Sequence, residues 1–151
     1  MAKKKVPAKD IAGKQPALLD VIEKPWGHEV ILARNDLYVV KQLFVKAGER
    51  LSKQFHNQKE EHLTLISGKG FISIEDEAAR AVVRMRPMDP FHVSPGTVYR
   101  ISAGDEDALF VEVSTPELDD VVRLEDDYGR QDDIKDIQSD IPELDNPDFE
   151  D

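Results

Sequence analysis

Short apolar segments separated by turn residues make up most of the chain between residues 15 and 130. The segments are rich in Val, Ile, Phe and Thr, and several alternate apolar with polar positions, which is typical of β-strands. Many short strands at this spacing predict an all-β protein built as an antiparallel sandwich or barrel. Single helical turns are also predicted near residues 15–22 and 117–122. The predicted strands span residues 28–33, 37–46, 50–56, 61–67, 70–75, 80–85, 91–93, 98–102 and 108–114.

The length of 151 residues fits one folded domain, which we place at residues 15–130. Residues 1–14 carry five Lys and one Asp and form a basic N-terminal extension. Residues 131–151 carry nine Asp or Glu and one Lys, so we expect an acidic, disordered tail. The alternative for this tail is a partner-binding helix with apolar residues at helical spacing, namely Ile134, Ile137, Ile141 and Leu144.

Composition narrows the classes of function. The net charge is −11 and the central domain is itself acidic, which argues against a nucleic-acid partner. The chain has no cysteines, which excludes disulfides, Cys-based zinc sites and thiol nucleophiles. No apolar run exceeds four residues, and no apolar stretch follows the basic N-terminus. We therefore expect no membrane partner and no secretory signal, and a cytoplasmic location.

One group of polar residues has the spacing of a metal site. Gln54 and His56 lie two positions apart on a predicted strand, so their side chains point to the same face. Glu61 opens the next strand after a polar turn, and a hairpin would bring it opposite His56. An amide oxygen, an imidazole and a carboxylate would suit Mn, Fe, Zn, Co or Ni. The alternative is an ordinary polar turn with an exposed His and a surface Glu.

A family resemblance strengthens the metal interpretation. The spacing of Gly48, Gln54, His56, Glu61 and Gly68 resembles the first motif of the cupin superfamily, and residues 94–101 (SPGTVYRI) resemble the second. Residues 24–130 are similar to the C-terminal isomerase module of type II phosphomannose isomerases. In the bifunctional bacterial enzymes that module follows a mannose-1-phosphate guanylyltransferase. The matching motifs lie at residues 24–29 (KPWGHE), 50–62, 95–101 and 121–130 (VVRLEDDYGR).

The resemblance implies a cupin fold, the double-stranded β-helix or jelly-roll barrel, and a divalent metal ion. Gln54, His56 and Glu61 match three of the family's metal ligands, but the fourth position falls on Tyr99 instead of a histidine. A phenol has an ordinary pKa near ~10, so it binds metal as phenolate only at a cost. Tyr99 could ligate the metal, leave it with three protein ligands and water, or mark a site that has lost it.

The family's chemistry is aldose–ketose isomerisation of a sugar phosphate, in which a base moves a proton between C2 and C1 through an enediol. By resemblance, the catalytic residues are Lys59, Glu61 and Arg50, with Lys59 standing where the family has an arginine. The cations expected to bind the phosphate are Arg50, Arg100 and Arg123. Each could instead be a surface residue in an ion pair. The family also implies a homodimer.

Three functions compete. The first is an isomerase-like cupin that acts on a sugar phosphate or a nucleotide-linked sugar. The second is a non-catalytic carbohydrate-binding cupin with a degenerate metal site, which Tyr99 and Lys59 favour. The third, a metal-dependent dioxygenase, is disfavoured because the motif supplies a single histidine where ferrous sites use two. His62 follows Glu61 and is expected to face the other way, in a structural role.

Overall fold

The computed structural model describes residues 5–7 and 20–132, and these residues form nine strands and no helix. Most of the predicted N-terminal extension, of the acidic tail and of the helical turn at 15–22 lies outside the described residues. The described end of that turn, from Val21, is strand instead of helix. The strands are β1 (Val21–Lys24), β2 (Gly27–Arg34), β3 (Val39–Val45), β4 (Lys53–Phe55), β5 (Glu61–Glu75), β6 (Arg80–Arg84), β7 (Pro90–Val93), β8 (Val98–Ser114) and β9 (Val122–Glu125).

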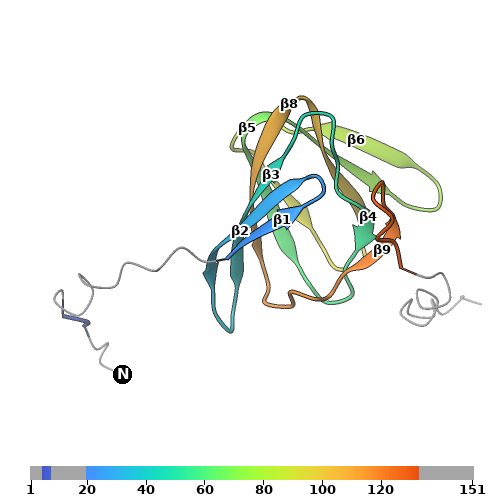
Figure 1. Cartoon of the computed structure of the whole chain (residues 1–151). Coiled ribbons are helices and arrows are strands. Elements are labelled where there is room, and N and C mark those ends of the chain that lie inside the picture. Colours follow the sequence, from blue (N-terminus) through green and yellow to red (C-terminus); the bar gives the residue numbers. More distant parts are fainter. Residues whose placement is uncertain (1–4, 8–19, 133–151) are drawn as a thin grey trace, which may run out of the picture.

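All strand pairs are antiparallel and curl around one interior (Figure 1). One path of paired strands runs β1-β2-β3-β8-β4-β9, and β5 pairs with β6, β7 and β8. The long strands β5 and β8 pair over most of their length, so they join the two halves of the barrel. The prediction of an all-β barrel is confirmed.

The two longest strands correct the prediction of separate segments. Residues 61–67 and 70–75 form one strand, and so do residues 98–102 and 108–114. At the first predicted break, in β5, the pairing register shifts between Leu65 and Ser67 and again between Gly68 and Gly70. The second predicted break lies in β8 between Ala103 and Ala108, the residues paired with Gly70 and Gly68. Glycine permits the positive φ of a bulge, so the chain bends there without leaving the sheet.

Three shorter elements also differ from the sequence prediction. β1 and β9 were not predicted; each has only four residues, and β1 (VIEK) lacks apolar–polar alternation. Residues 117–122 contain a turn instead of helix. The predicted strand 50–56 is ordered as strand only over Lys53–Phe55, with an isolated bridge between Arg50 and Ser102.

The interior is mostly apolar, with a polar group at one place. Its main cluster includes Leu43, Leu63, Leu65, Ile72, Ile101 and Phe110. Buried among these strands are several polar side chains: Ser52, His56, Lys59, Glu61, Arg100, Glu112 and Ser114. Burying ionisable groups costs free energy unless they are paired. The place where a function is to be sought is therefore marked by the buried ionisable residues that lie close together, His56, Lys59, Glu61 and Glu112.

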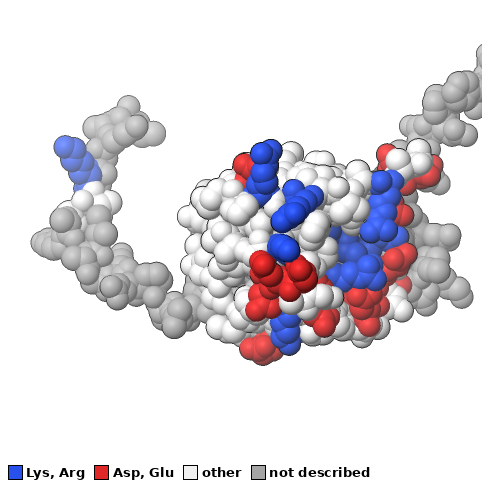
Figure 2. Space-filling view, turned by 90° about the horizontal axis from the view of Figure 1, so that it is seen from above, with Lys and Arg blue, Asp and Glu red and all other residues white. Residues whose placement is uncertain are grey.

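The outer surface carries charges of both signs. On the face seen in Figure 2, Lys and Arg lie beside Asp and Glu and do not form one large basic patch. Within the described residues, no helix is long and apolar enough to span a membrane.

Candidate functional site

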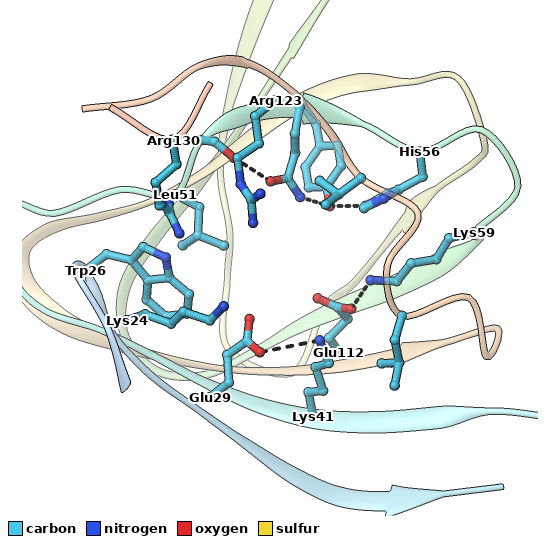
Figure 3. Close-up of a pocket in the computed structure, with 15 residues that line it drawn as sticks. Lys24, Trp26, Glu29, Lys41, Leu51, His56, Lys59, Glu112, Arg123 and Arg130 are labelled. Atoms are coloured by element: carbon cyan, nitrogen blue, oxygen red, sulfur yellow. Dashed lines mark hydrogen bonds and ion pairs between the residues drawn. The ribbon is translucent and has the colours of Figure 1, made fainter. Parts of the chain in front are cut away.

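A cavity of about 100 Å³ opens into the barrel beside the buried polar group. Figure 3 shows charged side chains from several strands converging on it, with Arg123 and His56 on one side and Glu29 and Lys41 on the other. The cavity is lined by Lys24, Trp26, Glu29, Lys41, Leu51, Ser52, Gln54, His56, Lys59, Tyr99, Glu112, Leu118, Val121, Arg123 and Arg130. This cavity therefore brings together Gln54 and His56 of the first motif and Tyr99 of the second. Glu61 lies next to the cavity, with its Oε1 3.6 Å from His56 Nε2.

A directed chain of hydrogen bonds joins five residues along the cavity wall. Ser52 Oγ donates to Gln54 Oε1 at 2.6 Å, and Gln54 Nε2 donates to Tyr99 Oη at 3.0 Å. The Nδ1 of His56 contacts the carbonyl oxygen of Asp120, which can only accept, so Nδ1 carries the proton. His56 Nε2 therefore accepts from Tyr99 Oη, which lies 2.9 Å away.

Strand pairing and one aspartate fix these positions. Gln54 of β4 pairs in register with Tyr99 of β8. The loop that follows β4 is held by Asp120, whose carboxylate accepts from the backbone N–H groups of residues 57, 58 and 59 at 2.6–3.0 Å. These three donors lower the pKa of Asp120 below its ordinary value, although burial opposes them. The loop thus delivers His56 and Lys59 to the cavity in fixed positions.

Lys59 and two glutamates form a buried ionic cluster. Lys59 Nζ lies 2.8 Å from Glu112 Oε1 and 3.5 Å from Glu61 Oε2. All three residues are buried: Lys59 is 5% exposed, Glu112 is 6% exposed and Glu61 is 1% exposed. Neither carboxylate oxygen of Glu61 has a hydrogen-bond partner among the described residues. One ammonium group therefore compensates two buried carboxylates.

The cluster moves the pKa values of its members in different directions. Burial and the charge of Glu61 raise the pKa of Glu112 to about 7, against the opposing effect of Lys59. Burial also acts to raise the pKa of Glu61, but the positive charge of Lys59 opposes it, and that pKa stays below its ordinary range. The pKa of Lys59 is raised because its two carboxylate neighbours outweigh the cost of its burial. Glu61 and Lys59 thus stay charged, whereas Glu112 can exchange a proton near neutral pH.

The arrangement of donor atoms does not match a divalent metal site. Burial and the charges of Glu61 and Glu112 raise the pKa of Tyr99 well above its ordinary value, so its side chain is a neutral phenol. That phenol uses its proton on Nε2 of His56, the imidazole nitrogen that would otherwise face a metal. Among the described residues, no three His, Cys, Asp or Glu side chains are grouped to hold an ion. The predicted metal thus rests on the family resemblance.

The three predicted phosphate-binding arginines lie in two different places. Arg123 of β9 lines the barrel cavity, and its Nε is buried without a hydrogen-bond partner among the described residues. Arg50 and Arg100 instead line a second cavity of about 240 Å³, together with Lys53, Ser73, Glu75, Arg80 and Glu125. Both of these arginines pair with Asp127, at 2.7 and 3.2 Å. Their roles in catalysis and phosphate binding stay predictions.

Sequence reasoning missed several residues of the site, among them Glu112 and Asp120. Glu112 lies within the apolar run ALFVEVS, two and four positions from the buried Phe110 and Ala108. Residues two apart on a strand face the same side, so this spacing could have predicted that Glu112 points inward. Asp120 had no comparable signal, because it is one of two adjacent aspartates in a loop. His62 is exposed and stacks on His92, as its predicted outward orientation requires.

The fold and the site define a cupin, a double-stranded β-helix protein. Residues 14–126 match the family described as Mannose-6-phosphate isomerase C-terminal, and the chain belongs to this family. It is 32% identical over 113 residues to the mannose-1-phosphate guanylyltransferase ManC of Salmonella typhimurium strain LT2, covering 72% of this chain and 23% of that protein. It is 30% identical to the mannose-1-phosphate guanylyltransferase of Escherichia coli K12, with the same coverage. The chain thus spans about a quarter of the length of these curated relatives.

Solved structures agree on the fold. The capsular polysaccharide assembling protein CapF of Staphylococcus aureus superposes with a TM-score of 0.65 at 20% identity, over 80% of this chain and 34% of that one. A double-stranded β-helix protein from Klebsiella pneumoniae superposes with a TM-score of 0.56 at 18% identity, over 82% of this chain and 99% of that one. At these identities the likeness extends to the fold alone.

Proposed function

We propose that this chain binds a sugar phosphate or a nucleotide-linked sugar in the barrel cavity. The main support for this proposal is that the guanidinium Nε of Arg123 is buried in the cavity wall without a hydrogen-bond partner among the described residues. A buried, unpartnered donor on a cation costs free energy, which a bound anion would recover. Arginine also suits a phosphate geometrically, because its planar fork donates two parallel hydrogen bonds.

The other cations of the cavity support an anionic ligand with polar groups along its length. Three of them have carboxylate partners, Lys41 with Glu29 at 3.4 Å, Lys59 with Glu112 at 2.8 Å and Arg130 with Asp126 at 2.9 Å. Such pairs supply both donors and acceptors, which a sugar with several hydroxyl groups can use.

Binding by Arg123 can be tested with mannose 6-phosphate, using neutral mannose and inorganic phosphate as comparisons. We expect Arg123→Gln to weaken binding of mannose 6-phosphate by roughly tenfold or more, the loss of one charge-assisted pair. Arg84→Gln, on the exposed strand β6, is the matched control and leaves affinity unchanged. Equal affinity of the wild type and Arg123→Gln, or equal affinity for mannose and mannose 6-phosphate, would overturn the proposal.

Aldose–ketose proton transfer is a second candidate function, and Glu112 favours it. This carboxylate lines the cavity, and its pKa of about 7 suits a group that takes a proton from one sugar carbon and returns it to the next. The negative charge that develops on the substrate oxygen in the enediolate would be stabilised by the ammonium of Lys59, held 2.8 Å from Glu112.

An isotope-exchange experiment distinguishes catalysis of proton transfer from carbohydrate binding without catalysis. If proton transfer occurs, deuterium from solvent enters C1 or C2 of the sugar phosphate, and Glu112→Gln abolishes the exchange while binding persists. Binding without any exchange, across a panel of sugar phosphates and nucleotide sugars, supports the non-catalytic carbohydrate-binding cupin instead.

The oligomeric state and the metal content of the protein are predictions that can each be measured directly. A homodimer is expected from the family, and light scattering at working concentration tests it, since a monomeric mass would contradict it. The family resemblance implies a divalent ion at Gln54, His56, Glu61 and Tyr99, and elemental analysis of protein purified without added metal salts measures whether the chain holds one.

A further inference from the structure

Lys59 places an ammonium group 3.5 Å from the buried carboxylate of Glu61. We propose that the Lys59 ammonium and the Tyr99 hydroxyl together replace the divalent metal ion of the family's site, so that this cavity works without a metal. The inference concerns the cavity of the proposed function, but it can be tested without any sugar.

Lys59 meets the electrostatic requirement that a metal ion would otherwise meet. Its Nζ lies 2.8 Å from Glu112 and 3.5 Å from Glu61, and its side chain is 6% exposed. A long lysine side chain is usually mobile, but the backbone N–H of Lys59 is fixed by the Asp120 carboxylate at 2.8 Å. The ammonium is therefore held at the two carboxylates by contacts at both ends of the residue.

Tyr99 meets the hydrogen-bonding requirement. Its hydroxyl lies between Gln54 Nε2 and His56 Nε2, at 3.0 and 2.9 Å, so it accepts from the first and donates to the second. These are two of the side chains that the sequence motif offers as metal ligands. With Tyr99 between them, each has its hydrogen-bonding partner inside the protein, and a metal would have to break both contacts.

The same geometry accounts for the unpartnered carboxylate of Glu61. Its two oxygens lack hydrogen-bond partners among the described residues, a feature that would ordinarily point to a missing cation. Glu61 lies between Lys59 Nζ at 3.5 Å and His56 Nε2 at 3.6 Å. A buried carboxylate requires an opposite charge nearby, and the ammonium of Lys59 supplies that charge. A divalent ion at Glu61 would be repelled by this ammonium.

The inference predicts that two substitutions convert the site into a metal site. Tyr99→His restores a neutral nitrogen donor, and Lys59→Met removes the competing charge while keeping much of the side-chain volume. We expect the double variant to take up about one Zn²⁺, Mn²⁺ or Co²⁺ per chain and to bind it at least tenfold more tightly than the wild type does. Adding His56→Ala to the double variant abolishes that uptake.

The experiment combines elemental analysis with thermal unfolding, with and without EDTA or added metal. The wild type is expected to contain no stoichiometric metal and to unfold at the same temperature under all conditions. A wild type that retains about one divalent ion per chain, or whose unfolding temperature falls in EDTA, overturns the inference. The wild-type measurements decide it even if the double variant does not fold. Because no sugar is present, a negative result here is distinct from failure to bind mannose 6-phosphate.

Discussion

The ammonium of Lys59 lies 2.8 Å from the carboxylate of Glu112, in the interior of the barrel, where both side chains are almost fully buried. Lys59 comes from the loop between β4 and β5, whereas Glu112 comes from near the end of β8. Lys59 also faces Glu61 at 3.5 Å, so this one cation is shared between two acids. Burial and the charge of Glu61 raise the pKa of Glu112 to about 7, whereas the charge of Lys59 helps to keep Glu61 ionised.

Glu112→Gln should flatten the pH dependence of stability. The pKa of Glu112 is raised from 4.5 to about 7 in the folded protein, so the protonated form is favoured by folding. Its contribution is therefore complete below about pH 4.5 and is lost as the pH rises through about 7. Between pH 5 and pH 8 the wild type should lose on the order of 2 kcal/mol of unfolding free energy relative to Glu112→Gln. Urea unfolding at several pH values measures this difference.

The control for that series is Glu77→Gln, at an exposed turn position between β5 and β6. Its unfolding free energy should follow the wild type at every pH. A difference between wild type and Glu112→Gln that stays constant from pH 5 to pH 8 would contradict the assignment.

Asp120→Asn should loosen the loop that carries His56 and Lys59. The wild-type carboxylate accepts from three consecutive backbone N–H groups, and the amide that replaces it loses one acceptor oxygen and the negative charge. We expect a loss of about 1–3 kcal/mol at pH 7. The pKa of Asp120 is lowered in the fold, so its contribution is present above its ordinary value and fades as the pH falls through the folded pKa.

The checks on Asp120 are hydrogen exchange and denaturation. Amide exchange at residues 57–59 should speed up in Asp120→Asn at pH 7, while exchange in β3 stays unchanged. Asp119→Asn is the neighbouring control, because the carboxylate of Asp119 takes no part in these three bonds. Equal exchange in the two variants would refute the role given to Asp120.

Gly68→Ala should be much more destabilising than Gly96→Ala, although both glycines have φ near +80° (85° and 80°). A Cβ at Gly68 would lie 1.7 Å from the carbonyl oxygen of Asp107 on β8, whereas nothing lies within 4 Å of a Cβ at Gly96. Gly96→Ala should cost about 1–2 kcal/mol, the cost of the left-handed backbone alone. Gly68→Ala adds a backbone clash and should cost roughly 3 kcal/mol or more. Equal losses in thermal or urea unfolding would show that β5 and β8 can separate there.

Tyr99→Phe should destabilise the fold while keeping the packing of the ring. The substitution leaves His56 Nε2 without a donor and Gln54 Nε2 without an acceptor in a buried setting. We expect a loss of about 1–3 kcal/mol of unfolding free energy. Tyr38→Phe serves as the control, since that side chain is 45% exposed and should change stability by less than about 0.5 kcal/mol. Unchanged stability of Tyr99→Phe would mean that the hydrogen-bond chain contributes nothing.

The sequence by itself determined the class of the fold and one side of the site. Alternation along the strands predicts which residues face inward, because successive side chains in a strand point to opposite faces. That rule, with the motif spacing, brought Gln54, His56 and Glu61 together and directed His62 outward. The position of Tyr99 beside them followed from the family resemblance, and its pairing with Gln54 agrees with it.

Only the tertiary structure decided what surrounds those residues. Strand parity says which face a side chain occupies, but not which strands lie next to one another. Glu112 lies beside Lys59 because β8 pairs along β5. Arg100 and Arg123, which were predicted to bind the same phosphate, line different cavities. Charge pairing across such distances in sequence depends on register and on the curl of the sheet. These arise from the packing of the whole barrel, so no local pattern in the sequence contains them.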